Sequence, residues 1–376
     1  MYPLAGGKML KKHFETLPDG RVQGRVHHSL LEIVMTTILA VLKGCESWYH
    51  IVDFAKARKS WLKEHFEIQF AKGIPSHDTF QRIFELLNPK EFEKRFVSWV
   101  RAICKLHKNE FVNIDGKTVC GSRKADNSAI HIVSAWANQN RLVLGQRKVN
   151  DKSNEITAIP ELLDLLELKG CIITIDAMGC QRAIAEKICS KKAGYVLALK
   201  ANQNTLYDDV KTYFEGIPYE SQPLLKEKTQ EKSHGRVETR EYWLTTDIFW
   251  IGAKDRWAGL KSIGKVESKV HRNGKATTET RYYISSLTDI DLFSKAVRSH
   301  WGIENSLHWC LDVIFDEDRQ RSRKGYTAEN LALARKIVMN MLQKTPTEEP
   351  MSLKGKLKKC AYDEEFFFKV ILHNSE

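Results

Sequence analysis

The sequence predicts an α/β protein: a mixed β-sheet with helices on its faces, a β-rich insertion within the sheet region, and a helical domain before it. Three observations predict this fold class. Residues 21–108 have apolar side chains at helical spacing, residues 111–149 contain three short apolar strands, and residues 155–200 alternate between helix and strand. A strand meander indicates antiparallel pairing, whereas alternating strands and helices indicate parallel pairing, so together they predict a mixed sheet.

Composition limits the classes of protein to which the chain can belong. Its 376 residues suggest two or three structural units. The 59 Lys and Arg against 47 Asp and Glu give a net charge of +12, which favours a polyanionic partner. The eight cysteines form no C-x-x-C pair and no secretory signal is visible, so we expect reduced thiols in a cytoplasmic protein. No apolar run approaches the ~20 residues of a membrane span.

The helical domain is expected over residues 21–108, after a lead-in of residues 1–20. In HSLLEIVMTTILAVLKG, apolar residues from Leu30 to Val41 share one helical face, and Gly44 suits a C-terminal cap. The segments SWYHIVDFAKARKSWLKEHF, SHDTFQRIFELLNP and EFEKRFVSWVRAICKL continue the same spacing. We therefore expect four or five short helices in this domain.

The sheet domain is expected over residues 109–345. Three strands are predicted first, over residues 111–119, 130–137 and 141–149. Helix EITAIPELLDLLEL, strand CIITID, helix CQRAIAEKICSK and strand YVLALK follow in alternation. Residues 201–288 read as antiparallel strands with Gly and Asn turns and predict the β-rich insertion. Helices return from residue 289, and residues 346–376 are expected to be a C-terminal tail.

Two aspartates end apolar strands of the predicted sheet. Asp115 follows an apolar run in FVNIDGKTVCGSR, and Asp176 ends CIITID. Each of them alone would most often be a turn residue. Ligands of open α/β sheets, however, bind beyond the carboxyl ends of the strands, so aspartates at two neighbouring ends can share a cation.

The third carboxylate is on a late helix, in DLFSKAVRSHWGIENSLHWCLDVIF. The apolar spacing from Phe293 to Trp301 places Glu304 where an apolar residue is expected, with His300 and His308 one turn to either side. A glutamate on a buried stripe needs a metal or a cationic partner, so a structural ion pair is the alternative explanation.

Together, Asp115, Asp176 and Glu304 predict a metal site. Because the set contains carboxylates and no cysteine, Mg²⁺ or Mn²⁺ suits it better than zinc. Two such ions, ~3.5–4 Å apart, can activate a water or hydroxyl and stabilise the leaving oxygen in phosphodiester chemistry. The basic chain would supply the surface that binds phosphates.

Seven motifs resemble those of the H-repeat-associated transposases of bacterial insertion sequences, which belong to the wider DDE superfamily: GIPSHDTFQRIF, NIDGKTVCGS, DKSNEITAIPELL, TIDAMGCQ, YVLALKANQ, SHGRVETR and HWGIENSLHWCLDV. The resemblance covers about residues 13–345. It implies a ribonuclease H-like catalytic fold, an N-terminal transposase-associated region and an acidic triad at Asp115, Asp176 and Glu304. It also implies cleavage and strand transfer at the ends of a double-stranded DNA element with two Mg²⁺ or Mn²⁺ ions, in a homodimeric synaptic complex that acts at the nucleoid.

The chain departs from the wider superfamily around the final glutamate. Many relatives have Tyr, Arg and Lys there, at spacings where this chain has Val297, His300 and Leu311. His300 is a candidate replacement for the arginine, and the lysine has no counterpart. Asp312, eight residues after Glu304, is a rival third ligand, although it lies roughly 80° further round the helix.

Ten residues are candidates for contact with DNA. Some follow the first aspartate, some follow a strand end in LKANQ on the rim that carries the carboxylates, and others form the basic run DRQRSRKG. Solvated surface charge is the alternative for the cations. The candidates are Lys117, Arg123, Lys200, Asn202, Gln203, His300, Arg319, Arg321, Arg323 and Lys324.

Three other functions fit parts of the pattern. A ribonuclease H-like nuclease or resolvase would use the same carboxylates, and a catalytically inactive DNA-binding derivative would keep the basic surface. A zinc hydrolase could be built on His300, Glu304, His308 and Cys310, although zinc sites usually lack two distant strand-end aspartates. The basic surplus, the helical domain and the large insertion favour a transposase, which must hold specific DNA ends.

Overall fold

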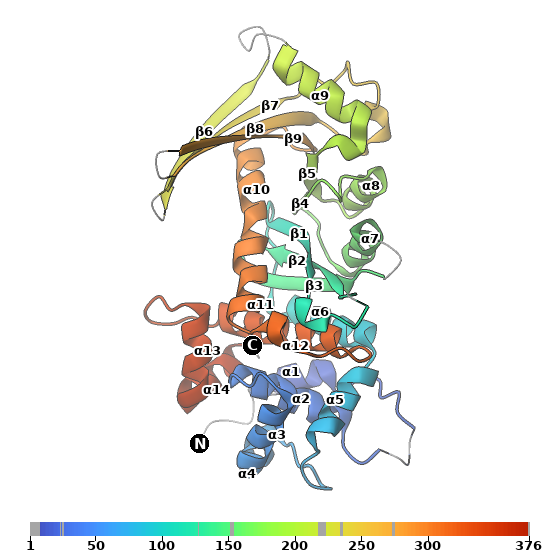
Figure 1. Ribbon diagram of the computed structural model, residues 1–376, viewed down its shortest axis with the longest axis vertical. Coiled ribbons are helices and arrows are strands. Elements are labelled where there is room, and N and C mark those ends of the chain that lie inside the picture. The colour runs from blue at the N-terminus through green and yellow to red at the C-terminus, as the bar shows by residue number, and fades with distance from the viewer. Residues whose placement is uncertain are drawn as a thin grey trace.

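The computed structural model describes residues 8–22, 24, 26–126, 128–150, 154–216, 223–233, 236–272 and 275–374. Residues 151–153 and His234, in two of the sequence motifs, lie outside them. The molecule is elongated, and the sheet extends along its long axis (Figure 1). The N-terminal helices lie at one end and strands β6 to β9 at the other. Among the described residues, no helix is long and apolar enough to cross a membrane.

Six helices precede the sheet: α1 (Lys8–Phe14), α2 (Leu30–Leu42), α3 (Trp48–Ala57), α4 (Lys59–Phe66), α5 (His77–Leu86) and α6 (Pro89–Ile103). Local capping explains where several of them begin. The side chains of Ser29, Ser47 and Ser76 accept hydrogen bonds from the first turns of α2, α3 and α5. Asn88 does the same for α6, in which Pro89 takes the first helical position, where no N–H is needed. The helices predicted over this region are therefore confirmed.

The sheet has nine strands in the order β3-β2-β1-β4-β5-β9-β8-β7-β6. Its first half contains β1 (Phe111–Thr118), β2 (His131–Ala137), β3 (Leu142–Lys148), β4 (Ile172–Ile175) and β5 (Gly194–Leu199), connected after β3 by α7 (Glu155–Leu165) and α8 (Arg182–Ser190). Strands β1, β2 and β3 pair antiparallel, whereas β1, β4 and β5 pair parallel. The mixed sheet is thus confirmed, and Ile114 of β1 is paired with Ile175, the last residue of β4.

The insertion continues this sheet. It contains α9 (Asn204–Gly216), β6 (Leu225–Ser233), β7 (Arg236–Thr245), β8 (Ser262–Arg272) and β9 (Lys275–Ser285). Strand β9 pairs antiparallel with β5, so the backbone hydrogen bonds run without interruption from one end of the sheet to the other. The sequence predicted β7, β8 and β9 but not β6 or α9; β6 reads LKEKTQEKS, which offers few apolar side chains to reveal a strand.

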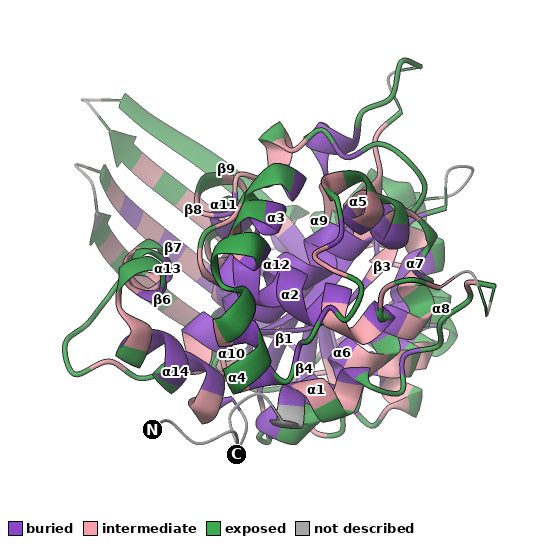
Figure 2. Ribbon diagram, turned by 90° about the horizontal axis from the view of Figure 1, so that it is seen from below, coloured by how far each residue is buried: buried purple, intermediate pink, exposed green. Residues whose placement is uncertain are grey.

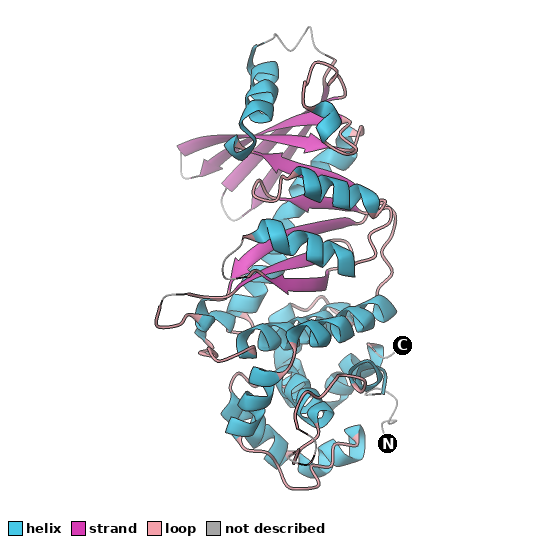
Figure 3. Cartoon of the chain, turned by 90° about the vertical axis from the view of Figure 1, so that its right-hand side faces the viewer, coloured by secondary structure: helices cyan, strands magenta, loops and turns pink. Residues whose placement is uncertain are grey.

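Helices cover the sheet on both sides. Helices α7, α8 and α9 lie on one side and α10 (Ile290–Ile303) lies on the other (Figures 1 and 3). An apolar cluster under α10 includes Phe111, Ile172 and Val196 from three neighbouring strands, together with Phe293 of α10. Phe293 is fully buried and sits over Gly264 of β8, where a Cβ atom would lie 2.3 Å from its ring. Helix α10 is therefore fixed to both halves of the sheet.

Helix α12 (Thr327–Lys344) joins the sheet to the helical domain, and both α12 and α2 are mainly buried (Figure 2). The side chain of Asn340 donates to the carbonyl of Val143 and accepts from its N–H, each at 2.8 Å. This satisfies backbone groups on the edge strand β3. Asn330 donates to the carbonyls of Phe84 and Leu87, both at 2.9 Å. Buried amides with specific partners fix how α12 is placed between the two regions.

Residues 346–376, expected as a tail, contain α13 (Leu353–Tyr362) and α14 (Glu364–His373). Phe367 of α14 is fully buried, and its ring centroid lies 5.4 Å from that of Trp61 in α4. Helix α1, within the expected lead-in, is also packed, because Phe14 is buried 5.5 Å from the ring of Phe92. Both ends of the described chain therefore contribute to the core of the helical domain.

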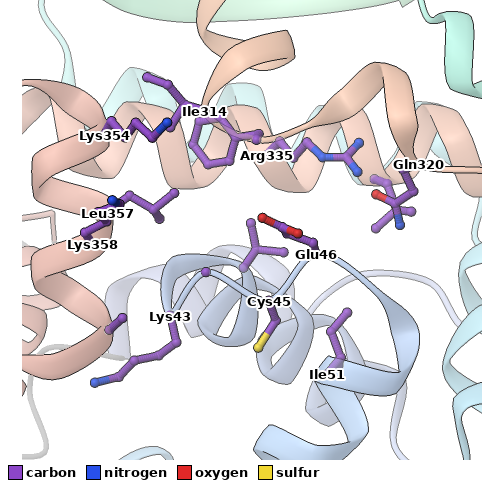
Figure 4. A pocket seen from close by; sticks show the side chains of 15 residues that line it. Lys43, Cys45, Glu46, Ile51, Ile314, Gln320, Arg335, Lys354, Leu357 and Lys358 are labelled. Carbon is purple, nitrogen blue, oxygen red and sulfur yellow. The ribbon is translucent and has the colours of Figure 1, made fainter.

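A cavity of about 270 Å³ lies between α2, α12 and α13 (Figure 4). Glu46, after α2, and Arg335 of α12 both line it. Burial lowers the pKa of Arg335, and the charges of Glu317, Asp316 and Glu46 oppose this effect. Arg335 Nη1 lies 3.7 Å from Glu317 Oε1, so the guanidinium connects the cavity wall to the segment that follows the late helix.

We expect Phe367→Ala to lower the free energy of unfolding by about 3–5 kcal/mol, because it removes a fully buried ring from the helical core. Tyr362→Ala, on the preceding helix, removes a side chain that is 78% exposed and should change stability by less than about 0.5 kcal/mol. Urea unfolding followed by circular dichroism measures both. Equal, small effects would show that α14 does not share the core.

Candidate active site

One face of β1 lies along α10 and the turns that follow it. Side chains of a strand alternate between faces, so Asn113, Asp115 and Lys117 point the same way. Asn113 Nδ2 donates to Ser299 Oγ at 3.1 Å, and Lys117 Nζ lies 2.7 Å from Asp312 Oδ1. These two contacts attach the helix to the strand on either side of Asp115. The carboxylate is therefore held opposite the middle of this helical segment.

Asp115, Glu304 and His308 come together at this point. One potential ligand atom from each lies within 4.8 Å of the other two. His308 Nδ1 is 3.1 Å from Glu304 Oε2 and 3.7 Å from Asp115 Oδ2. His308 is 4% exposed, whereas the Glu304 side chain is 60% exposed. The group thus has a buried floor and an open side, and its two carboxylates and imidazole can bind a divalent cation.

A local change in helix geometry brings Glu304 and His308 to the same aspartate. Residues Glu304–His308 form a π-helical turn between α10 and α11 (Trp309–Val313). Such turns are wider than α-helical turns and often occur at functional sites. The expectation that Trp301 and Glu304 lie on a buried stripe is wrong, since both are exposed. The turn lies beside Asp115. Asp176 directly follows β4, as predicted, but the prediction that Asp115 ends its strand is wrong, because β1 continues past it to Thr118 and stays paired with β2.

Asp176 follows the strand next to that of Asp115, at the same level along the sheet. The two aspartates directly follow the last paired residues of the parallel strands β4 and β1. Asp176 Oδ1 accepts the N–H groups of Met178 and Gly179 at 3.1 and 3.3 Å, so one oxygen also shapes the turn. Burial raises the pKa of Asp176, and the charge of Glu155 raises it further. Among the described residues, Asp176 is outside the group of three that lies within 4.8 Å.

Charge repulsion is concentrated on Asp115. Burial raises its pKa to about 7, and the carboxylates of Glu155, Asp176 and Glu304 act in the same direction, against a hydrogen bond from the backbone of Gly116. Such an arrangement favours either a proton or a cation at the site. The charges of Asp176 and Glu304, both predicted from the sequence, thus act on Asp115 in the same direction.

Glu155 and His131 are site residues that the sequence analysis missed. Glu155 begins α7, and its Oε1 lies 2.6 Å from His131 Nε2. An acidic residue directly after the capping Asn154 is what a helix start ordinarily contains, so the local sequence gave no reason to place Glu155 in the site. Its effect on both aspartates is visible only once β1, β4 and α7 are packed together.

Lys117, predicted to contact DNA, belongs to a buried ion-pair network. Its Nζ lies 2.7 Å from Asp312, 3.1 Å from Glu317 and 3.3 Å from Asp318, and the side chain is 11% exposed. Burial alone would lower the pKa of Lys117, but these three charges raise it above its ordinary value. The geometry favours a structural role, in which ion pairs hold β1 against α11 and the segment that follows it. It also places Asp312, the rival third ligand, in an ion pair outside the group around Asp115.

His300 is placed at the interface between α10 and β4. Its Nδ1 lies 2.9 Å from Thr174 Oγ1. Burial, with the nearby positive charges of Arg281 and His308, lowers the pKa of His300 to about 4. The ring is therefore neutral near pH 7, which favours a positioning role over a phosphate contact.

The LKANQ segment supports the turn that follows Asp176. Asn202 Nδ2 donates to the carbonyl of Ala177 at 2.7 Å, and Gln203 Nε2 donates to the carbonyl of Cys180 at 3.0 Å. Lys200 is exposed, and its charge lowers the pKa of Asp176, so it lies on the rim of the site.

The cations of the basic run after α11 are all on the surface. Arg319, Arg321, Arg323 and Lys324 are all exposed, as is Arg123 after β1. The two segments touch, because a Cβ atom at Gly121 would lie 2.3 Å from the carbonyl of Gln320. Asp318 also accepts the N–H of Cys120 at 3.0 Å. The two segments that carry the five cations thus meet at Asp318, which is also a partner of Lys117. The cations are Arg123, Arg319, Arg321, Arg323 and Lys324.

A groove of about 360 Å³ lies between α10 and strands β7, β8 and β9. The guanidinium of Arg281 lies 5.2 Å from the ring of Trp301, which is 44% exposed. Arg298 donates two hydrogen bonds to Glu231, at 2.9 and 2.8 Å. Trp301 also lines the groove and lies one helical turn before Glu304. The groove, lined by arginines and an exposed aromatic ring, therefore extends to within one helical turn of Glu304.

Comparison with known proteins decides the family. Residues 107–341 match the model described as "Transposase DDE domain", and residues 11–100 match the model described as "DDE_Tnp_1-associated". The chain belongs to the DDE transposase family. It is 40% identical to "Putative transposase YncI" of Escherichia coli O157:H7, over 98% of this chain and 95% of that one. It is 37% identical to "H repeat-associated putative transposase YhhI" of Escherichia coli (strain K12), over 97% and 98%. The family resemblance seen in the sequence is confirmed.

Among solved structures, this DDE transposase resembles a piggyBac transposase synaptic complex with hairpin DNA. The TM-score is 0.42 and the identity 12%, over 97% of this chain and 78% of that chain. The family assignment stands on the sequence matches alone.

The donors at the site of this DDE transposase fit a cation that prefers oxygen ligands. The described group with potential metal ligands within 4.8 Å contains Asp115, Glu304 and His308, but not Cys310. The zinc alternative needs Cys310 as a ligand, and Cys310 lies outside this group. Because His300 is also engaged with Thr174, the donor set does not favour the zinc-hydrolase alternative.

The half-buried His300 should make stability depend on pH. Its pKa is about 4 in the folded chain and about 6.5 when unfolded, so the unfolded chain binds more protons between these values. Its stabilising contribution is present above pH 6.5 and is lost as the pH falls, by about 2 kcal/mol from pH 7 to pH 5. Other groups titrate in the same range, so wild type is compared with His300→Gln. The advantage of wild type in urea unfolding should shrink at pH 5; an advantage that is the same at both values would contradict this.

Proposed function

We propose that this transposase cleaves phosphodiester bonds at the ends of an insertion sequence and joins the freed strand to target DNA, with the help of divalent metal ions. The convergence of Asp115, Glu304 and His308 within 4.8 Å carries the proposal. Close carboxylates repel one another unless a cation lies between them. A metal site beside exposed cations suits the transfer of a phosphodiester bond, and membership of the DDE transposase family supports this reaction.

The arrangement of the strands supports a ribonuclease H-like catalytic domain. Strands β1 to β5 have the order β3-β2-β1-β4-β5, with β1 to β3 antiparallel and β4 and β5 parallel to β1. We assign residues 109–345 to this domain, residues 201–288 to an insertion that extends its sheet, and residues 21–108 to a helical domain that helps to hold the DNA ends. In this scheme Asp115 on β1 and Asp176 directly after β4 face the same DNA strand.

Asp115, Asp176 and Glu304 would hold two Mg²⁺ or Mn²⁺ ions. When bound, these ions would supply Lewis acidity that activates the attacking oxygen and stabilises the leaving one. The protein itself contributes the position of each ligand. His308, through its 3.1 Å contact, orients Glu304, while the turn after β4 orients Asp176.

The DNA would lie across the exposed cations and the groove beside Glu304. The basic run and Arg123 suit phosphate contacts, since all five side chains are exposed. Lys200 is placed on the rim near Asp176, and Arg281 and Trp301 line the groove that leads to Glu304. Two element ends must be brought together before joining, so we propose a homodimer as the synaptic form, acting on the nucleoid in the cytoplasm.

Asp176→Asn should separate binding from chemistry. The change removes a carboxylate from the metal site but no cation from the DNA surface, so cleavage and joining should fall at least about 100-fold while end binding stays within about twofold. A gel-shift assay and a strand-cleavage assay with Mg²⁺ or Mn²⁺ on DNA carrying the element ends measure the two properties. Asp164→Asn, an exposed carboxylate on α7, is the matched control and should keep both. Loss of end binding in a folded Asp176→Asn protein would mean that the metal site belongs to the recognition surface.

The salt dependence of DNA binding should identify the basic run as a contact surface. Replacing both Arg321 and Arg323 with Ala should flatten the slope of log affinity against log salt by about two units, if each binds one phosphate. The control replaces Lys108 and Lys169 with Ala; these two are also exposed but precede β1 and β4, at the edge of the sheet opposite the carboxylates. Equal slopes for both double variants would remove the basic run from the interface.

A further inference from the structure

A fourth carboxylate stands beside the metal site. Glu155 is the first residue of α7, and its side chain is 12% exposed. An acidic residue at a helix start is usually explained by the helix dipole, and such residues normally reach into solvent. Glu155 instead turns inward, towards the end of β1, so the helix start alone does not account for its position.

The neighbouring glycine shows how close this carboxylate comes to β1. A Cβ atom at Gly116 would lie 2.2 Å from Glu155 Oε1 and 2.2 Å from His131 Nε2. Only glycine leaves room for the pair at this position, directly after Asp115. Glu155 therefore lies against β1, directly beside Asp115.

His131 fixes the orientation of this carboxylate. Its Nε2 lies 2.6 Å from Glu155 Oε1, and its Nδ1 lies 3.0 Å from Thr118 Oγ1. A histidine with partners on both ring nitrogens is held in one orientation, as are groups that support metal ligands. The contact with His131 uses Oε1, and the carboxylate has a second oxygen to offer.

A structural ion pair does not explain where Glu155 is placed. A pair with His131 could form on the surface, away from other acids. Here the carboxylate adds to the repulsion among half-buried acids, which costs folding free energy in the metal-free chain. A bound divalent cation would turn the same arrangement into an attraction. The independent group formed by Asp115, Glu304 and the buried His308 already indicates a cation at this edge.

We propose that Glu155 is a fourth carboxylate of the metal centre, oriented by His131, and that it binds a divalent ion, or water on that ion, between Asp115 and Asp176. This inference rests on the metal site of the proposed function. It gives a residue at the start of α7, outside the acidic triad, a role in metal binding.

Mn²⁺ binding to the full-length protein without DNA tests the proposal, by isothermal titration calorimetry. Glu155→Gln keeps the size of the side chain and an oxygen for His131 but removes the charge, so the Kd for Mn²⁺ should rise about tenfold or more. Glu161→Gln, the same change on an exposed residue of α7, should leave the Kd within about twofold. His131→Gln should weaken Mn²⁺ binding less than Glu155→Gln does, because it loosens the carboxylate without removing it.

Asp115→Asn separates the two proposals in the same assay. If Asp115→Asn weakens Mn²⁺ binding and a folded Glu155→Gln protein does not, Glu155 is a structural residue and only this inference fails. If neither change affects binding, or wild type binds no Mn²⁺, the metal site itself is absent and both proposals fail. A lower melting temperature of Glu155→Gln with an unchanged Kd would likewise assign Glu155 to structure alone and overturn the inference.

Discussion

The contact between one face of β1 and the late helix is the constraint on which the site depends. Asn113 reaches Ser299 and Lys117 reaches Asp312, so the helix is attached to the strand before and after Asp115. Buried polar groups are costly when they lack partners, so the hydrogen bond of Asn113 and the ion pair of Lys117 both favour this register of helix and strand. The register in turn brings the Glu304 side chain to Asp115. Acids that repel one another are thus held together by contacts on either side of them.

The sequence revealed those parts of the site that follow from apolar strands. FVNIDG and CIITID each end a buried run with an aspartate, and parallel pairing places such ends at one edge, so Asp115 and Asp176 could be predicted. The surroundings of Glu304 could not, because a constant helical period hides the π-helical turn and the exposure of Trp301. Lys117 looked like a surface cation, since its partners Glu317 and Asp318 are about 200 positions away.

The fold shows a similar division between what was visible in the sequence and what was not. Helices α2 to α6 and the strands β1 to β5 carry clear apolar periods and caps, so their existence could be predicted. Strand β6 has Lys and Glu where most strands have apolar residues, and its pairing with β7 is set by the hairpin instead. The ends of the chain were expected to be peripheral, but α1 and α14 bury aromatic rings that complete the helical core. One core of buried apolar side chains spans the helices and the sheet.

The π-helical turn lets α10 and α11, on either side of it, both direct the required side chains toward the sheet. Before the turn, α10 must present Phe293 and Ser299 to the sheet; after it, the same helix must present Asp312 to Lys117. Winding Glu304–His308 as a regular α-helical turn, with no residue removed, would rotate every later side chain by about 100° relative to the earlier ones. Asp312 would then swing away from β1 while Ser299 stayed in place. The π-helical turn therefore sets the angle about the helix axis between the side chains of α10 and those of α11.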